Sequence, residues 1–125
     1  MTDKRAAVAK VIGADFELAN SFIGNLVGSP RQAASSLLSE IRGYPRNNRR
    51  GTSIEYGRRF LATSGGSWYI DSDHLEGNLP EHTRALEHPD ILHGAGFVQA
   101  RLAQIAAETR LPAGTRLNLL ANCSD

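Results

Sequence analysis

Polar and apolar residues alternate near the start of the chain. Residues 8–18 are rich in β-branched and aromatic side chains, which predicts a strand. Because successive side chains of a strand point to opposite faces, Asp15 and Glu17 are expected on one face and Phe16 and Leu18 on the other. The first predicted strand therefore presents two carboxylates together.

A helix is predicted over residues 30–41 by its boundaries and its periodicity. Ser29 can cap the helix, Pro30 suits the first helical position, and Gln32 completes a capping box with Ser29. Gly43 then ends the helix. Apolar residues recur at three- and four-residue spacing and predict one buried stripe: Ala33, Ala34, Leu37, Leu38 and Ile41.

The middle of the chain is divided by polar segments. Residues 44–52 are polar and basic and are interpreted as an exposed loop. Residues 55–63 fit either a short helix or the approach to a strand, and the pattern does not separate the two. A turn at 64–67 precedes residues 68–71, whose aromatic and β-branched side chains predict a strand that returns as a hairpin.

The last third of the chain predicts a long helix over 89–109 and a final strand over 117–121. With the earlier elements, this order predicts an α+β fold, a mainly antiparallel sheet with two helices on one face. We expect a single domain over 1–125 with a mobile tail at 1–7. The expected buried stripe of the long helix is Ile91, Leu92, Ala95, Val98, Leu102, Ile105 and Ala106.

Composition narrows the class of protein. Of the 125 residues, 41% are hydrophobic and 22% are charged, which is typical of a globular domain. The net charge of +1 provides no overall field for a nucleic-acid partner, and no run of about 20 apolar residues suggests a membrane span. The lone Cys123 and the absence of a secretory leader pattern indicate the reducing cytoplasm.

Oxygen ligands gather at alternate positions of the two predicted strands. Asp15 and Glu17 lie on the first strand, Tyr69 and Asp71 on the second, and Glu76 follows shortly after. Carboxylates that face one another repel unless a cation or a proton compensates them. Hard oxygen ligands without cysteine suit magnesium, which proteins hold with a few carboxylates and substrate phosphates. The pattern indicates a nucleotide-dependent magnesium site or, equally, the solvent face of a half-exposed sheet.

Three segments resemble the start of the Pup ligase and Pup deamidase/depupylase family of proteasome accessory factors. They are the Gly-Ala-Asp-Phe-Glu segment at 13–17, the segment from Trp-Tyr-Ile-Asp through His-Leu-Glu to Pro-Glu at 68–81, and the closing Asn-Cys-Ser-Asp at 122–125. The spacing from Tyr-x-Asp to His-x-Glu is the most specific element. The resemblance implies a glutamine-synthetase-like catalytic fold, in which an antiparallel sheet holds ATP and Mg²⁺.

The resemblance also implies roles for individual residues. Asp15, Glu17, Tyr69 and Glu76 match magnesium contacts, and Asp71 matches the general base. The implied reaction joins a glutamate carboxylate to a lysine amine through an acyl phosphate. The implied partners are a small Pup-like protein or peptide that ends in Glu or Gln, and a target that bears a lysine.

The chain departs from the family at two nucleotide-binding positions. Ser67 stands where the family has an arginine, and Leu79 stands where it has a threonine. A replacement phosphate contact is available from Arg58, from Arg59 or from the basic loop at 46–50. These departures indicate a divergent branch with an unassigned substrate.

Two other functions stay open. One is an amide hydrolase of the deamidase/depupylase type, because the five-residue interval from Asp71 to Glu76 resembles that branch more closely than the ligases. The other is a non-catalytic binding or assembly module. Since the chain resembles only the first quarter of the family, we expect a fragment that is inactive alone, with a bare edge at 117–121 through which it self-associates.

Overall fold

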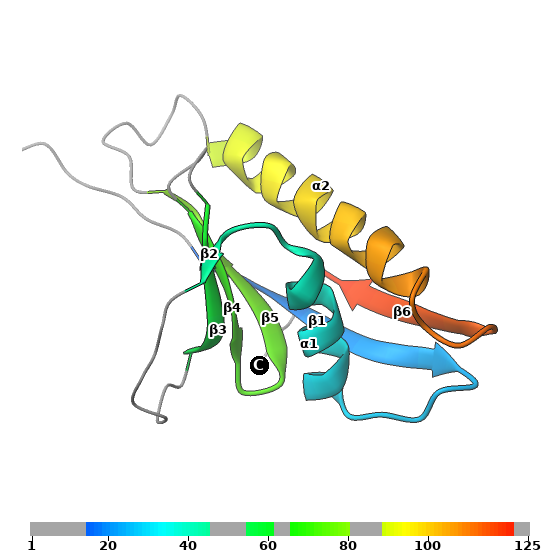
Figure 1. Cartoon of the computed structure of the whole chain (residues 1–125). Coiled ribbons are helices and arrows are strands. Elements are labelled where there is room, and N and C mark those ends of the chain that lie inside the picture. The colour runs from blue at the N-terminus through cyan, green and yellow to red at the C-terminus, as the bar shows by residue number, and fades with distance from the viewer. Residues whose placement is uncertain (1–14, 46–54, 62–65, 81–88, 122–125) are drawn as a thin grey trace, which may run out of the picture.

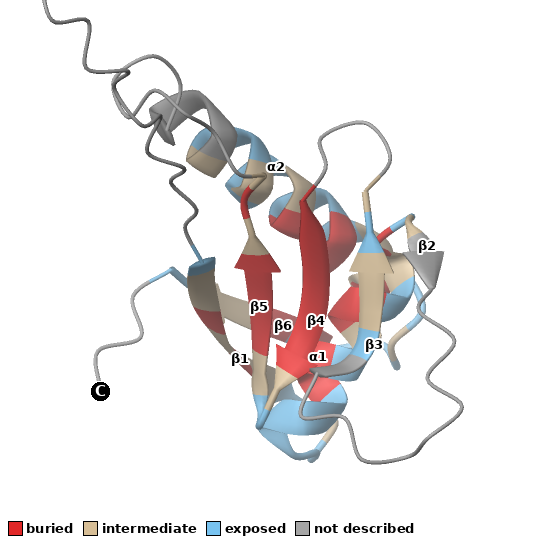
Figure 2. Cartoon of the chain, turned by 90° about the vertical axis from the view of Figure 1, so that its left-hand side faces the viewer, coloured by how far each residue is buried: buried red, intermediate tan, exposed pale blue. Residues whose placement is uncertain are grey.

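The fold is an antiparallel sheet with two helices on one face, as Figures 1 and 2 show from two sides. The computed structural model describes residues 15–45, 55–61, 66–80 and 89–121. The six strands lie in the order β2-β3-β4-β5-β1-β6. The elements are β1 (Asp15–Gly24), α1 (Pro30–Glu40), β2 (Tyr44–Pro45), β3 (Glu55–Phe60), β4 (Ser67–Asp71), β5 (His74–Asn78), α2 (Pro89–Glu108) and β6 (Thr115–Leu120).

This architecture confirms the expected α+β class. The expected tail at 1–7, most of the loop at 44–52, the first half of the turn at 64–67 and the closing segment at 122–125 lie outside the described residues.

The first strand runs further toward the C-terminus than its sequence pattern predicts. Residues 15–18 belong to β1 as expected, but the strand continues to Gly24, and residues 8–14 are not described. The prediction ended at Leu18 because Asn20 and Ser21 interrupt the apolar alternation. Asn20 is nevertheless buried, because its amide pairs with backbone groups inside the fold.

Helix α1 confirms both its predicted ends and its buried stripe. The Ser29 side chain accepts a hydrogen bond from the backbone of Gln32, and the Gln32 side chain accepts one from the backbone of Ser29. All five predicted stripe residues lie in the hydrophobic core. This helix is specified locally, since its cap and its periodicity agree.

Two strands were not predicted from the sequence. One is the two-residue β2, which stands at the start of the predicted loop at 44–52 and pairs with β3. The other is β5, which pairs with β4 as a tight hairpin, in which Asp71 is opposite His74, and with β1 on its other side. Within the segment 55–63, which fitted either a helix or the approach to a strand, residues 55–60 form strand β3. The polar character of His74, Glu76 and Asn78 obscured β5, although these residues alternate with buried positions.

Helix α2 is confirmed in extent, but its expected buried stripe is wrong. Val98, Leu102 and Ile105 are exposed, as is Ala95, and Ala106 is half-buried; the side chains of residues 91 and 92 are not described. Small residues on another face of α2 enter the core instead, namely Ala100, Ala103 and Ala107. An alanine face lets a helix approach its neighbours closely, so this face packs inward although the larger aliphatic residues lie elsewhere.

The core lies between the sheet and the two helices. Phe16 packs edge-on against Trp68 at a ring-centroid distance of 5.1 Å. A Cβ atom added at Gly77 or Gly96 would lie within 2.7 Å of the Phe16 ring, so both glycines give this ring its space. The inward packing of Phe16 and Leu18 leaves Asp15 and Glu17 on the opposite face of the sheet, as the alternation predicts.

Candidate functional site

The face of the sheet opposite the helices carries rows of polar side chains from β1, β5 and β4, and Figure 2 shows these strands in front of the helices. Alternate residues of each strand lie on this face, and the register brings them side by side. The rows are Asp15, Asn78 and Ser67; Glu17, Glu76 and Tyr69; and His74 with Asp71.

Three carboxylates converge on this face. Glu17 of β1, Asp71 of β4 and Glu76 of β5 each place a carboxylate oxygen within 4.8 Å of the others. All three were singled out from the sequence, and together they offer the hard oxygen donors that suit Mg²⁺. The N-terminal acid Asp15 lies in the neighbouring row, where it accepts a hydrogen bond from the Asn78 amide.

Glu76 is the buried member of this acidic cluster, with 7% of its surface exposed. Burial raises its pKa above the ordinary value of 4.5, and the negative charges of Asp15, Glu17 and Asp71 raise it further. The Tyr69 hydroxyl donates a hydrogen bond to the Glu76 carboxylate and partly offsets this rise in pKa. Burial and this bond raise the pKa of Tyr69 too, so Tyr69 stays a neutral donor.

Replacing Glu76 with Gln is expected to stabilise the fold at neutral pH. Because the fold raises the pKa of Glu76, the native state retains a proton that the unfolded chain releases, and stability falls as pH rises from about 4.5 through the raised pKa. Glutamine keeps an acceptor for Tyr69 and removes the charge. We expect the melting temperature at pH 7.5 to rise by about 4 °C, equivalent to about 1 kcal/mol. The gain should shrink at pH 4; an equal or larger gain there would contradict the assignment.

A guanidinium group lies beside the acidic cluster. Arg58 of β3 donates hydrogen bonds to Ser67 Oγ at 2.5 Å and to Asn78 Oδ1 at 2.7 Å. Its Cζ lies 3.9 Å from the ring centroid of Tyr69, which makes a cation–π contact. Arg58 therefore adjoins Ser67, the position where the resembled family carries its nucleotide-binding arginine.

Asn78 connects the positive and negative parts of this face. Its oxygen accepts from both Arg58 and Ser67, while its amide nitrogen donates to Asp15. Asn78 was not predicted as a site residue, although its alternation with His74 and Glu76 is a signal in the sequence that points to it. His74 Nδ1 lies 3.5 Å from a Glu17 oxygen.

Of the other predicted positions, Arg59 is opposite Trp68 in the pairing of β3 with β4. Leu79 is buried on the helix side, where it lines a cavity with Phe16 and Trp68. It is therefore separate from the acidic cluster. The loop at 46–50 lies outside the described residues.

Comparisons with known proteins do not assign this chain to a family. No family model matches it, and no curated protein matches it. In the described part of the chain, neither α1 nor α2 combines the length and apolar character that a membrane crossing requires.

Proposed function

We propose that this face is the magnesium–nucleotide site of a carboxylate–amine ligase that resembles Pup ligase, of which the chain forms the N-terminal part. The observation that carries the proposal is the convergence of Glu17, Asp71 and Glu76 beside the guanidinium of Arg58. A cluster of carboxylates next to a cation has the charge pattern that a metal-bound phosphate requires.

In this proposal each side chain has a distinct task. Glu17 and Glu76 hold Mg²⁺, which when bound neutralises charge on the transferring phosphate. Tyr69 orients the Glu76 carboxylate through its hydroxyl. Asp71, at the end of β4, takes the proton from the attacking lysine amine as the general base. Asp15 orients Asn78, which in turn positions Arg58.

Magnesium binding to the 125-residue chain tests the metal part of the proposal. At a free Mg²⁺ concentration ten times the Kd, the fold gains about 1.4 kcal/mol, which raises the melting temperature by about 5 °C. Trp68 fluorescence provides a second readout, because Trp68 precedes Tyr69 on β4.

Glu17→Gln should abolish both responses to Mg²⁺. Asp73→Asn is the matched control, since Asp73 is an exposed acid in the adjoining turn and lies outside the cluster. No saturable response of the unmodified chain up to about 20 mM Mg²⁺ would contradict the metal site and would favour the binding or assembly module.

Arg58 is expected to bind the nucleotide rather than the metal. We predict that Arg58→Ala weakens ATP binding by about tenfold or more in the presence of Mg²⁺, because it removes a charge-assisted contact to phosphate. The same variant should keep the Mg²⁺-dependent rise in melting temperature. Arg116→Ala removes the same charge from an exposed position on β6 and should bind ATP normally. Equal ATP affinity of the two variants, measured by calorimetry, would refute the role of Arg58.

The second candidate is an amide hydrolase of the deamidase/depupylase type, which the five-residue interval from Asp71 to Glu76 favours. In that reaction Asp71 activates the attack on a glutamine amide. A Pup-like peptide that ends in Gln separates the two candidates, because only the hydrolase releases ammonia from it without forming a bond to lysine. A peptide that ends in Glu and a lysine acceptor test the ligase in parallel.

A further inference from the structure

An exposed phenylalanine lies on the same face of the sheet as the acidic cluster. In the pairing of β3 with β4, Phe60 is opposite Ser67, whose row continues through Asn78 to Asp15. Residues that are opposite one another on neighbouring strands point to the same face of a sheet. Phe60 keeps 42% of its surface exposed. Its ring is therefore accessible from the side on which the acidic cluster lies.

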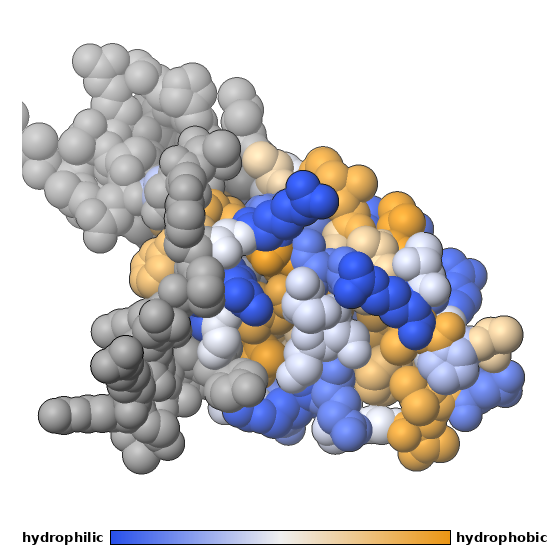
Figure 3. All heavy atoms as spheres, viewed as in Figure 1, coloured by the Kyte–Doolittle hydropathy of each residue, from blue (hydrophilic) through white to orange (hydrophobic). Residues whose placement is uncertain are grey.

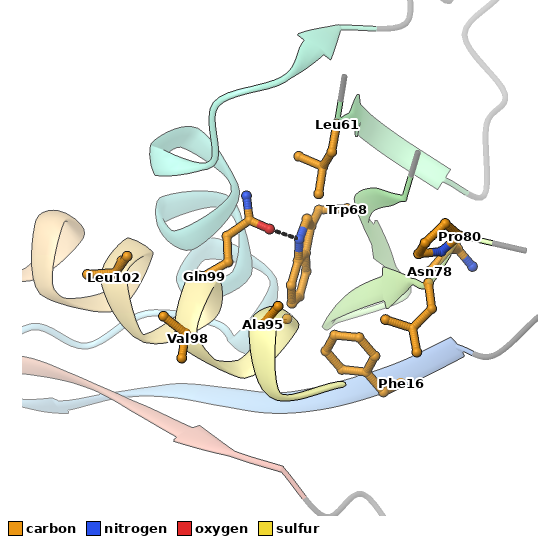
Figure 4. A pocket seen from close by; sticks show the side chains of 11 residues that line it. Phe16, Leu61, Trp68, Asn78, Pro80, Ala95, Val98, Gln99 and Leu102 are labelled. Carbon is orange, nitrogen blue, oxygen red and sulfur yellow. Dashed lines mark hydrogen bonds between the residues drawn. The ribbon is translucent and has the colours of Figure 1, made fainter. Parts of the chain in front are cut away.

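The aromatic rings on the helix side of the sheet pack against one another. Phe16 packs edge-on against Trp68, and the ring centroids of Phe97 and Phe16 are 5.4 Å apart. Figure 4 shows Phe16 and Trp68 at the cavity beside α2, where Gln99 accepts a hydrogen bond from the Trp68 indole nitrogen. Phe60 is not a member of the hydrophobic core that the described residues form. Core packing therefore does not account for this ring.

The exposed apolar side chains of α2 lie away from the proposed site. Val98, Leu102 and Ile105 are exposed on this helix, and Figure 3 shows hydrophobic side chains at the surface of this part of the molecule. Helix α2 covers the face of the sheet opposite the acidic cluster. Phe60 differs from these residues, because charged and hydrogen-bonding groups of the proposed site lie beside it.

Arg58 connects the Phe60 ring to the acidic cluster. Its Cζ lies 5.9 Å from the ring centroid of Phe60 and 3.9 Å from that of Tyr69, so both rings are within cation–π range. The Tyr69 hydroxyl donates in turn to Glu76 of the cluster. Carboxylates, a guanidinium and an exposed ring therefore follow one another across this face. A metal-bound nucleoside triphosphate presents the complementary order of metal, phosphates and base.

The separation of these groups suits one nucleotide. Phe60 lies on β3, two strands from Glu76 on β5, and the Phe60–Ser67 row is two residues along the strands from the row of Tyr69 and Glu76. With strands about 4.8 Å apart and a rise of about 3.3 Å per residue, the backbones of Phe60 and Glu76 are about 12 Å apart. A nucleoside triphosphate can extend over such a distance from its terminal phosphate to its base.

We propose that Phe60 forms the base-binding part of the nucleotide site, with the adenine of ATP stacked on its exposed ring. This inference rests on the proposed function, because it takes the acidic cluster and Arg58 as the place of the metal-bound phosphates. Stacking on an aromatic side chain uses the flat face of a base, so it requires a ring at this position rather than a polar group.

Calorimetric titration of the 125-residue chain with ATP and with inorganic triphosphate, each in the presence of Mg²⁺, tests this role. Inorganic triphosphate supplies the phosphates without a base. We expect Phe60→Leu to bind ATP about tenfold more weakly and inorganic triphosphate with unchanged affinity, because leucine keeps an apolar side chain but removes the flat ring. Phe60→Tyr retains the ring and should bind ATP normally. Arg58→Ala should weaken the binding of both ligands.

Phe97→Leu is the matched control, because it makes the same substitution at a ring that is 38% exposed on α2. It should bind both ligands normally, and circular dichroism checks that each variant is folded. Unchanged ATP affinity of Phe60→Leu, or an equal loss of affinity for both ligands, would overturn the role of Phe60. The proposed function would survive either result if Arg58→Ala still weakened the binding of both ligands. If the unmodified chain bound neither ligand, both proposals would be overturned.

Discussion

Replacing Asn20 with Ala is expected to lower the free energy of unfolding by about 3 kcal/mol. Asn20 is 5% exposed, and its amide nitrogen donates to the carbonyls of Pro30 at 2.6 Å and Asp73 at 3.0 Å. Its side-chain oxygen accepts from the N–H of Leu75 at 2.9 Å. Removing the amide leaves three backbone groups without these bonds, and each such loss costs about 1 kcal/mol or more.

Urea denaturation measures this loss, and the exposed Asn25 provides a matched control. Asn25 also donates to a backbone carbonyl, that of Ala113 at 3.2 Å, but solvent can replace this bond. Asn25→Ala should therefore cost less than about 1 kcal/mol. A similarly small loss for Asn20→Ala would show that water fills the Asn20 site. Because Asn20 holds the turn that follows Asp71, its replacement should also reduce magnesium binding.

The elements that the sequence predicts best are those whose signals are local. Helix α1 has its cap, its first-turn proline and its apolar stripe within thirteen residues, and the structure confirms all three. The extension of β1 past Leu18 has a different origin, since a buried asparagine is tolerated only where distant backbone groups pair with it. Those partners on α1 and on the β4–β5 turn are set by tertiary structure.

Helix α2 shows how a periodic pattern can predict the wrong buried face. Large aliphatic residues at 98, 102 and 105 give a stronger hydrophobic signal than the alanines at 100, 103 and 107. The distance between the helix and the sheet decides which face packs inward, and Gly96 illustrates this close approach by contacting Phe16. That distance is set by tertiary structure and cannot be predicted from a short segment of sequence.

The sequence predicted which residue types form the candidate site and that they share one face of the sheet. It did not predict which of these residues lie opposite one another on neighbouring strands. Alternation places Glu17 on the open face of β1 and Asp71 on that of β4. Which acids meet depends on strand register, and the register places Glu17 opposite Glu76 but Asp15 opposite Asn78. Since β5 was not predicted as a strand, this division of the acids was not accessible from sequence.

Replacing Asp71 with Asn is expected to reduce turnover by about 10²–10⁴-fold in the full-length gene product, because it removes the proposed general base. The first measurement is the intact mass of the gene product isolated from its source cells. If the mass is near 13.5 kDa, the activity assay must include a partner polypeptide; if the mass is larger, the assay must use the longer chain. ATP-dependent joining of a Pup-like peptide to a lysine acceptor is the measured activity. Undiminished product formation by Asp71→Asn would refute the role of Asp71.

A second measurement separates a base from a residue that only holds metal. Asp71 lies within 4.8 Å of Glu17 and Glu76, so its replacement also weakens the magnesium site. If Asp71 acted only as a ligand, saturating Mg²⁺ would restore kcat, whereas the loss of a base persists at every metal concentration and removes the acidic limb of the pH–rate profile. We expect the persistent loss for Asp71→Asn and normal kcat for Asp73→Asn, whose carboxylate lies outside the cluster. Full restoration of kcat by Mg²⁺ would show that Asp71 acts only as a metal ligand. The attacking lysine amine would then have no assigned general base on this face of the sheet.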